Sequence, residues 1–168
     1  HYISHRRRLA GQPVYGYKLL SYKVRSVRHV LLLMDLIGWQ FIHLHRRDVI
    51  SQAKSFLVAK KRQVWHQTKV NCAISAPVRI GVDEMESELD KRKRCSAIDH
   101  QAIQGIEHLD LYYEDDLEHT EDWPATADKI SRYLQVESFE IADVAHAKIA
   151  DRPYDEIIEN YSEIEEYL

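Results

Sequence analysis

One segment of the chain has the residue types and spacing for binding an anion: Phe41 to Ala59, FIHLHRRDVISQAKSFLVA. A short apolar run is followed by two arginines, Arg46 and Arg47, and then at once by a predicted helix. Arginine binds phosphate through a two-pronged guanidinium, and a helix N-terminus favours negative charge. Ser51 and Ser55 lie four and eight residues after Arg47, on one side of that helix. The pattern predicts a phosphate site; a solvated arginine pair at a strand end is the ordinary alternative.

The charge distribution also indicates an anionic ligand. Residues 1–70 contain 14 Lys and Arg against two acids, and residues 71–168 contain 9 against 25, which together give the net charge of −4. A half this basic is typical of proteins that bind nucleic acid, nucleotide phosphates or anionic substrates. The alternative is that the two halves simply attract each other within the fold.

Length and composition limit the class of protein. The 168 residues predict one domain, 1–168, and 45% hydrophobic residues with five Gly and four Pro exclude a low-complexity chain. Two cysteines exclude a disulfide scaffold. The chain has no apolar run of about 18 residues, so the sequence predicts no membrane span and we expect a cytoplasmic protein. Residues 1–12 are expected to form an irregular basic segment. The first residue is His1, so we expect further sequence upstream.

Periodicity predicts the elements that must position the arginines. We expect strands at 13–20, 39–45 and 106–113, and helices at 21–34, from 48, at 82–103, from 122, at 138–147 and at 153–168. Alternating strands and helices predict an α/β fold, a three-layer parallel sheet flanked by helices. Three strands are few for such a sheet, and no glycine-rich phosphate loop is present. Both features suggest that an N-terminal part of the sheet is missing.

Four segments in order resemble the PAPS-dependent sulfotransferases of bacterial type, including the nodulation-factor and glycolipid sulfotransferases; PAPS is 3′-phosphoadenosine 5′-phosphosulfate. They are PVYGYKLL, similar to that family's Gly-x-Lys strand; RRDVISQAKSFLVAKKRQVWH, similar to its 3′-phosphate segment; LDLYYEDDLE with the later RYLQV, similar to its Tyr-Glu-Asp strand and following helix; and RPYDEIIENYSEIEEYL, similar to its C-terminal helix. The resemblance covers about residues 13–168. It implies a P-loop-NTPase-like sulfotransferase fold with its N-terminal part missing.

The resemblance also implies roles for residues of this chain. Ser55 matches the serine that contacts the 3′-phosphate. Its spacing favours Arg47 as the partner arginine, and we prefer Arg47, although the strand register favours Arg46. Lys18 matches the Gly-x-Lys lysine, where a fixed cation would stabilise charge on the bridging oxygen during sulfuryl transfer. A surface lysine at a strand edge is the alternative.

Three further residues are implied as contacts of the nucleotide. Tyr113 matches the tyrosine beside the adenine, although a buried strand tyrosine is an equally ordinary interpretation. Lys148 and Arg152 precede the last helix, where the family presents basic contacts to the 3′-phosphate.

The sequence does not identify the general base. His43 and His45 are spaced as metal ligands, but no third ligand has matching spacing, so we expect no metal.

The resemblance implies a sulfotransferase, or its PAPS-binding portion, acting on a hydroxyl of a carbohydrate or glycolipid. A non-catalytic sulfotransferase-like module or a basic nucleic-acid-binding domain is the alternative, although the aromatic residues of 1–70 mostly occupy core positions and disfavour nucleic acid. The family's 5′-phosphosulfate loop is absent, so we expect this chain alone to bind the nucleotide weakly and to turn over nothing. A missing first strand would leave an open sheet edge, which predicts self-association into a homo-oligomer.

Overall fold

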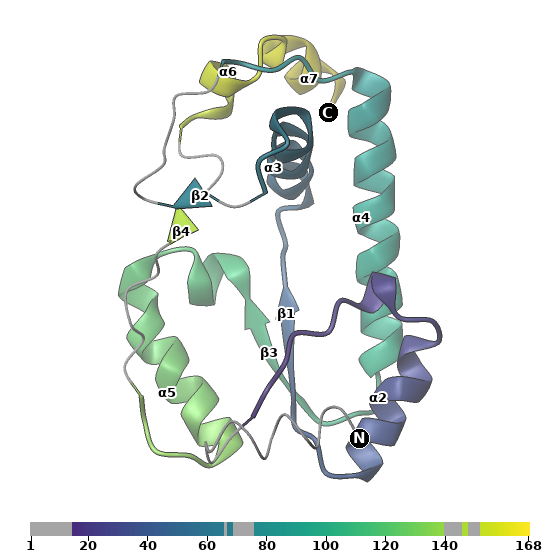
Figure 1. Cartoon of the computed structure of the whole chain (residues 1–168), viewed down its shortest axis with the longest axis vertical. Coiled ribbons are helices and arrows are strands. Elements are labelled where there is room, and N and C mark those ends of the chain that lie inside the picture. The colour runs from purple at the N-terminus through teal and green to yellow at the C-terminus, as the bar shows by residue number, and fades with distance from the viewer. Residues whose placement is uncertain (1–14, 66, 69–75, 140–145, 148–151) are drawn as a thin grey trace.

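The computed structural model describes residues 15–65, 67–68, 76–139, 146–147 and 152–168 (Figure 1). The elements in chain order are η1 (Ser21–Lys23), α2 (Val27–Leu36), β1 (Phe41–His45), α3 (Val49–Arg62), β2 (Gln67–Thr68), α4 (Val82–Ile103), β3 (His108–Tyr112), η2 (Tyr113–Leu117), η3 (Thr120–Asp122), α5 (Trp123–Leu134), β4 (His146–Ala147), α6 (Tyr154–Ile157) and α7 (Tyr161–Tyr167).

A small parallel sheet lies at the centre of the fold. β1 pairs with β3 from Phe41 opposite His108 to His45 opposite Tyr112. The short strands β2 and β4 pair separately and antiparallel. Mixed helices and strands with a parallel sheet confirm the predicted α/β class. The flanking three-layer arrangement of a P-loop-like sheet stays a prediction.

The predicted first strand is wrong for its described part, Tyr15 to Leu20, which has no regular secondary structure. This segment packs through its side chains instead. Tyr17 donates a hydrogen bond to Met34 Sδ at 3.0 Å and meets Trp39 edge-on, with 5.4 Å between ring centroids. Alternating aromatic residues at the wall of a cavity therefore produced a strand-like pattern.

Helix α2 begins at Val27, later than predicted. Ser21–Lys23 form only a 3-10 turn, and Ser26 has a left-handed φ of 58°, which separates that turn from the helix. The end is as predicted: Gly38 adopts φ +80°, a conformation that side chains disfavour. Val27 and Leu31 are the buried residues of the helix.

Helix α3 begins where the sequence predicts. The Asp48 carboxylate accepts a hydrogen bond from the Ser51 amide at 2.8 Å, which caps the helix. Ala53, Leu57 and Val58 are buried against the neighbouring elements. The first turn of α3 is thereby fixed directly after β1.

Helix α4 is confirmed over its full predicted span and joins the two hydrophobic cores. Its 22 residues give a length of about 33 Å. Met85 and Leu89 belong to a core with α3 and the C-terminal segment. Ala102 and Ile103 belong to a second core with α2 and β1. Figure 1 shows α4 running along one side of the molecule from α7 to α2.

The predicted C-terminal helix is divided into α6 and α7 by an extended link. Asn160 is buried, and its side chain makes two hydrogen bonds with the Ile80 backbone: Oδ1 accepts from N at 3.1 Å and Nδ2 donates to O at 2.8 Å. Ile158 forms a parallel bridge with Val78. In a continuous helix the backbone groups near Ile158 would bond to one another. Here they bond instead to the segment before α4, which contains Val78 and Ile80.

The predicted helix at 138–147 falls largely outside the described residues. His146 and Ala147 are described and lie in strand β4, so the prediction is wrong for them.

We expect Asn160→Ala to lower the free energy of unfolding by about 2 kcal/mol or more. The substitution leaves a buried peptide N–H and C=O unpaired, and each such group costs roughly 1–3 kcal/mol. Urea denaturation measures the loss. Arg79→Ala is the matched control, since Arg79 pairs with Glu163 on the surface nearby and should lose less than about 1 kcal/mol. Equal losses in the two variants would contradict the structural role of Asn160.

Candidate functional site

The carboxyl ends of β1 and β3 meet at one edge of the sheet. His45 and Tyr112 are the last paired residues. Arg46 and Arg47 follow β1, and the π-helical turn η2 follows β3. Parallel open sheets bind ligands at this edge. The two segments that the sequence marks for chemistry are therefore brought together.

Glu114 connects the two segments. Its Oε1 accepts hydrogen bonds from the backbone amides of Arg47 and Asp48, both at 3.1 Å. Burial opposes ionisation of this carboxyl, but the hydrogen bonds from its own amide and from those of Asp48 and Arg47 outweigh it, so the pKa lies below its ordinary value. The η2 turn, which follows β3, thus fixes the backbone at the start of α3.

The two consecutive arginines lie over different tyrosine rings. The Arg47 guanidinium lies over the Tyr112 ring at 4.1 Å and donates two hydrogen bonds to Asp115, both 2.7 Å. Arg46 lies over the Tyr113 ring at 4.2 Å. Arg47 is therefore engaged by a carboxylate, whereas the buried Arg46 Nε has no hydrogen-bond partner among the described residues.

Tyr154 contacts the first turn of α3, where it donates a hydrogen bond to the Ser51 carbonyl at 2.9 Å. Burial raises the pKa of Tyr154, and the positive charge of Arg46 acts against that rise. Ser55 is one turn beyond Ser51 and half-buried, and within the described part of the chain its hydroxyl has no hydrogen-bond partner.

The other residues predicted to contact the nucleotide are Tyr113, Arg152 and Lys148. Tyr113 is half-buried, with Arg46 on its ring. Arg152 is half-buried and precedes Tyr154, the first residue of α6, by two residues. Lys148 lies outside the described residues. The structure thus brings Arg46, Tyr113 and the segment after Arg152 to one place.

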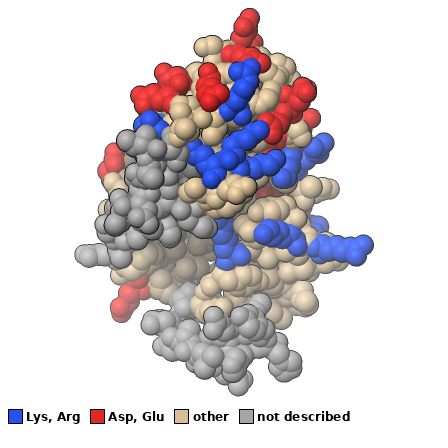
Figure 2. All heavy atoms as spheres, turned by 45° about the horizontal axis from the view of Figure 1, so that its top comes forward, with Lys and Arg blue, Asp and Glu red and all other residues tan. Residues whose placement is uncertain are grey.

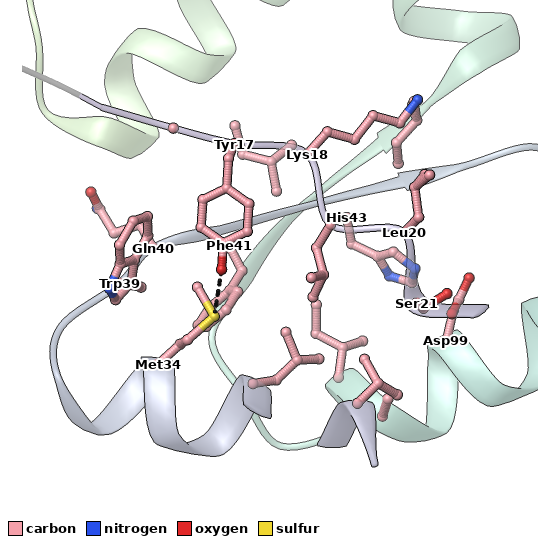
Figure 3. Close-up of a pocket in the computed structure, with 18 of the residues that line it drawn as sticks. Tyr17, Lys18, Leu20, Ser21, Met34, Trp39, Gln40, Phe41, His43 and Asp99 are labelled. Atoms are coloured by element: carbon pink, nitrogen blue, oxygen red, sulfur yellow. Dashed lines mark hydrogen bonds between the residues drawn. The ribbon is translucent and has the colours of Figure 1, made fainter. Parts of the chain in front are cut away.

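The predicted catalytic lysine lines a cavity next to this site. The cavity has a volume of about 950 Å³ and lies between residues 15–22, α2, β1 and the end of α4. It extends to Leu44 and to Gln52 in the first turns of α3. Lys18 is exposed and has no ion pair or hydrogen bond to any described residue; Figure 3 shows its side chain extending away from Tyr17 and Trp39.

Histidines and an aspartate converge on the other face of the sheet. His43 and His45 of β1 meet Asp110 of β3, which also contacts His108. His100 of α4 adds a ring whose centroid is 4.9 Å from that of His45. Burial, and then the neighbouring His45, lowers the pKa of His43 to about 4. The sequence analysis missed His108 and Asp110 because only the strand register places them here.

Ion pairs between the basic half (residues 1–70) and the acidic half (residues 71–168) neutralise some of the charges of each. Arg47 pairs with Asp115, Lys54 with Glu165 and Lys61 with Glu84. On the face in Figure 2, Lys and Arg side chains gather near the middle, with Asp and Glu around the top. Attraction between the halves therefore accounts for some of the basic residues, as the alternative interpretation of the charges predicted.

Comparison with known proteins identifies the class. Residues 12–163 match the family described as Stf0 sulphotransferase. The chain therefore belongs to this sulfotransferase family, and the resemblance found in the sequence is confirmed. No curated protein and no solved structure matches it. No helix within the described residues is both long and apolar enough to cross a membrane.

We expect Glu114→Ala to destabilise the fold by about 1–2 kcal/mol at neutral pH, because two amides at the start of α3 lose a charged acceptor. Urea denaturation at several pH values measures this. The low pKa of Glu114 means that its contribution is present above about pH 4.3, the ordinary value, and is lost as the pH falls through the folded pKa.

Glu114→Gln is the matched control, because it keeps an oxygen acceptor but cannot titrate. It should lose less stability than Glu114→Ala at pH 7, and the gap between wild type and Glu114→Gln should close in acid. A gap that stays constant with pH would contradict the assigned role of the carboxylate.

Proposed function

We propose that this chain forms the part of a PAPS-dependent sulfotransferase that binds the 3′-phosphate of the donor nucleotide. The observation that carries the proposal is Arg46: its buried Nε is unpartnered, and it lies over the Tyr113 ring in the short segment that joins β1 to α3. A guanidinium held by packing and lacking a hydrogen-bond acceptor fits an oxyanion. The reaction class follows from family membership.

Arg46 is assigned the phosphate in preference to Arg47. Arg47 already gives both terminal nitrogens to Asp115, so phosphate would have to displace a two-pronged ion pair. Arg46 requires no such exchange. Ser55 is one turn beyond Ser51, whose carbonyl accepts from Tyr154, and its hydroxyl has no hydrogen-bond partner among the described residues. From the family resemblance we assign Ser55 as a hydroxyl donor to the same anion.

The remaining contacts complete the nucleotide end. Tyr113 offers a ring beside Arg46 against which adenine can stack. Arg152, in the segment leading to Tyr154, adds positive charge at the start of α3, and Lys148 is assigned to the same group from the family resemblance. When bound, PAPS supplies the sulfuryl group that is transferred. Lys18 is the cation assigned to the bridging oxygen, where charge develops during transfer.

The cavity beside Lys18 is the site we assign to the acceptor. Its volume of about 950 Å³ suits a substrate of small-molecule size. Trp39 and Tyr17 present aromatic rings in its wall, and Gln40 adds an amide (Figure 3). Flat aromatic rings with a few polar groups suit the binding of a sugar. We therefore propose a hydroxyl of a carbohydrate or glycolipid as the acceptor.

We expect Arg46→Ala to weaken the binding of adenosine 3′,5′-bisphosphate by about 1.5–3 kcal/mol, the range for a hydrogen bond to a charged group. Ser55→Ala should lose on the order of 1 kcal/mol. Isothermal titration calorimetry measures both. Adenosine 5′-monophosphate lacks the 3′ group, so its affinity should be the same in wild type and in both variants.

Arg47→Ala is the matched control and should cost less than Arg46→Ala. A selective loss in Arg47→Ala alone would move the phosphate to that arginine while leaving the function intact. Equal losses for the two nucleotides would show that these residues do not recognise the 3′ end. Thermal stabilisation by a random oligonucleotide but not by the bisphosphate would favour the alternative, a nucleic-acid-binding module.

A further inference from the structure

The face of the sheet that carries Phe41 bears a group of side chains to which the proposed function gives no role, although His43 among them lines the cavity assigned to the acceptor. His43, His108 and Asp110 each place one ligand atom within 4.8 Å of the others. Two strands supply them, since His43 pairs with Asp110 across the ladder and His108 is two residues before Asp110. Their convergence follows from the register of β1 and β3.

A hydrogen bond fixes the tautomer of His108. His108 Nδ1 lies 2.6 Å from the Ile106 carbonyl, which can only accept, so Nδ1 carries the proton. In the neutral ring, His108 Nε2 is then a bare acceptor, and it lies 3.3 Å from Asp110 Oδ1. His43 Nδ1 is buried without a hydrogen-bond partner, 3.7 Å from the same oxygen. With the proton of His43 on its other ring nitrogen, a cation placed among these atoms would be bound by three lone pairs.

The two separations that involve Asp110 are close to those of a metal site. Ligands about 2.0–2.2 Å from a tetrahedral zinc ion lie roughly 3.3–3.6 Å from one another. The Asp110 oxygen is 3.3 Å from His108 Nε2 and 3.7 Å from His43 Nδ1. His45 Nε2 lies only 2.5 Å from that oxygen, too close for two ligands of one ion. His45 therefore donates to the carboxylate and orients it, as second-layer groups of metal sites do.

We propose that His43, His108 and Asp110 bind a divalent transition-metal ion of the zinc class, with His45 as a positioning residue. Imidazole nitrogens with one carboxylate are a ligand set that zinc prefers. The His43 and His108 side chains are 14% and 23% exposed, whereas Asp110 is 45% exposed, which leaves an open side for the ion to enter.

A second carboxylate lies in the same region. Asp99 Oδ1 is buried without a hydrogen-bond partner, and Figure 3 shows Asp99 and the His43 ring on the same side of the cavity. An unpaired carboxylate oxygen adds negative charge to the surroundings of the cluster. The bound ion would connect β1 to β3 directly before the arginines, so its first expected effect is on stability.

The test uses the chain freed of metal by chelator and then titrated with Zn²⁺ or Co²⁺. We expect Co²⁺ to give the intense visible absorption of tetrahedral coordination with one ion per chain. Zn²⁺ should compete it away and, at roughly a hundredfold above its Kd, raise the melting temperature by about 5–10 °C.

His108→Ala and Asp110→Asn should abolish the cobalt absorption, and His45→Ala should weaken affinity by roughly 10–100-fold, with partial rescue in His45→Gln. His119→Ala removes an exposed histidine elsewhere and should bind as wild type does. Circular dichroism of each metal-free variant shows that it is folded. If folded His108→Ala and Asp110→Asn keep the cobalt spectrum, or if His119→Ala loses it, the binding comes from other histidines and the proposal is overturned.

Discussion

The parallel pairing of β1 with β3 is the constraint on which the rest of the site depends. Five residue pairs, from Phe41 opposite His108 to His45 opposite Tyr112, fix which side chains meet. A slip of one residue would turn every β1 side chain to the other face relative to β3. His43 would then no longer face Asp110, and Arg46 and Arg47 would no longer lie over the two tyrosine rings. The cluster of histidines and the anion site are two products of one register.

The two faces of this sheet have different surroundings. On one face Phe41 is buried in the core with α2 and the end of α4, and His43 and His45 follow it along the strand. On the other face Ile42 and Leu44 are 40% and 49% exposed. Beyond the strand, Arg47 lies over the Tyr112 ring and Arg46 over the Tyr113 ring. Consecutive arginines thus acquire separate tasks: Arg47 holds Asp115 of the η2 turn, while Arg46 keeps an unpartnered nitrogen.

What the sequence predicted well was local. The cap of α3 depends on Asp48 and Ser51, three residues apart, and α4 depends on its own periodicity, so both were predictable. The segment from Tyr15 to Leu20 and the break at Asn160 depend on partners far along the chain, Trp39 and Ile80, which no local pattern reveals. The same holds within the site. The sequence marked Arg46, Arg47 and Ser55 but could not choose between the arginines, because the choice depends on Asp115.

The polar groups at the strand ends explain why the two proposed ligands would occupy different places. Three carboxylates lie there: Glu114 on the backbone of α3, Asp115 on Arg47, and Asp110 among the histidines. Asp115 and one oxygen of Glu114 already accept from donors, whereas Arg46 keeps an unpartnered nitrogen. Asp110 is shared by three histidines, and one buried oxygen of Asp99 has no hydrogen-bond partner among the described residues. The proposed phosphate therefore suits the unpartnered cation, and the proposed metal ion suits the carboxylate that the histidines surround.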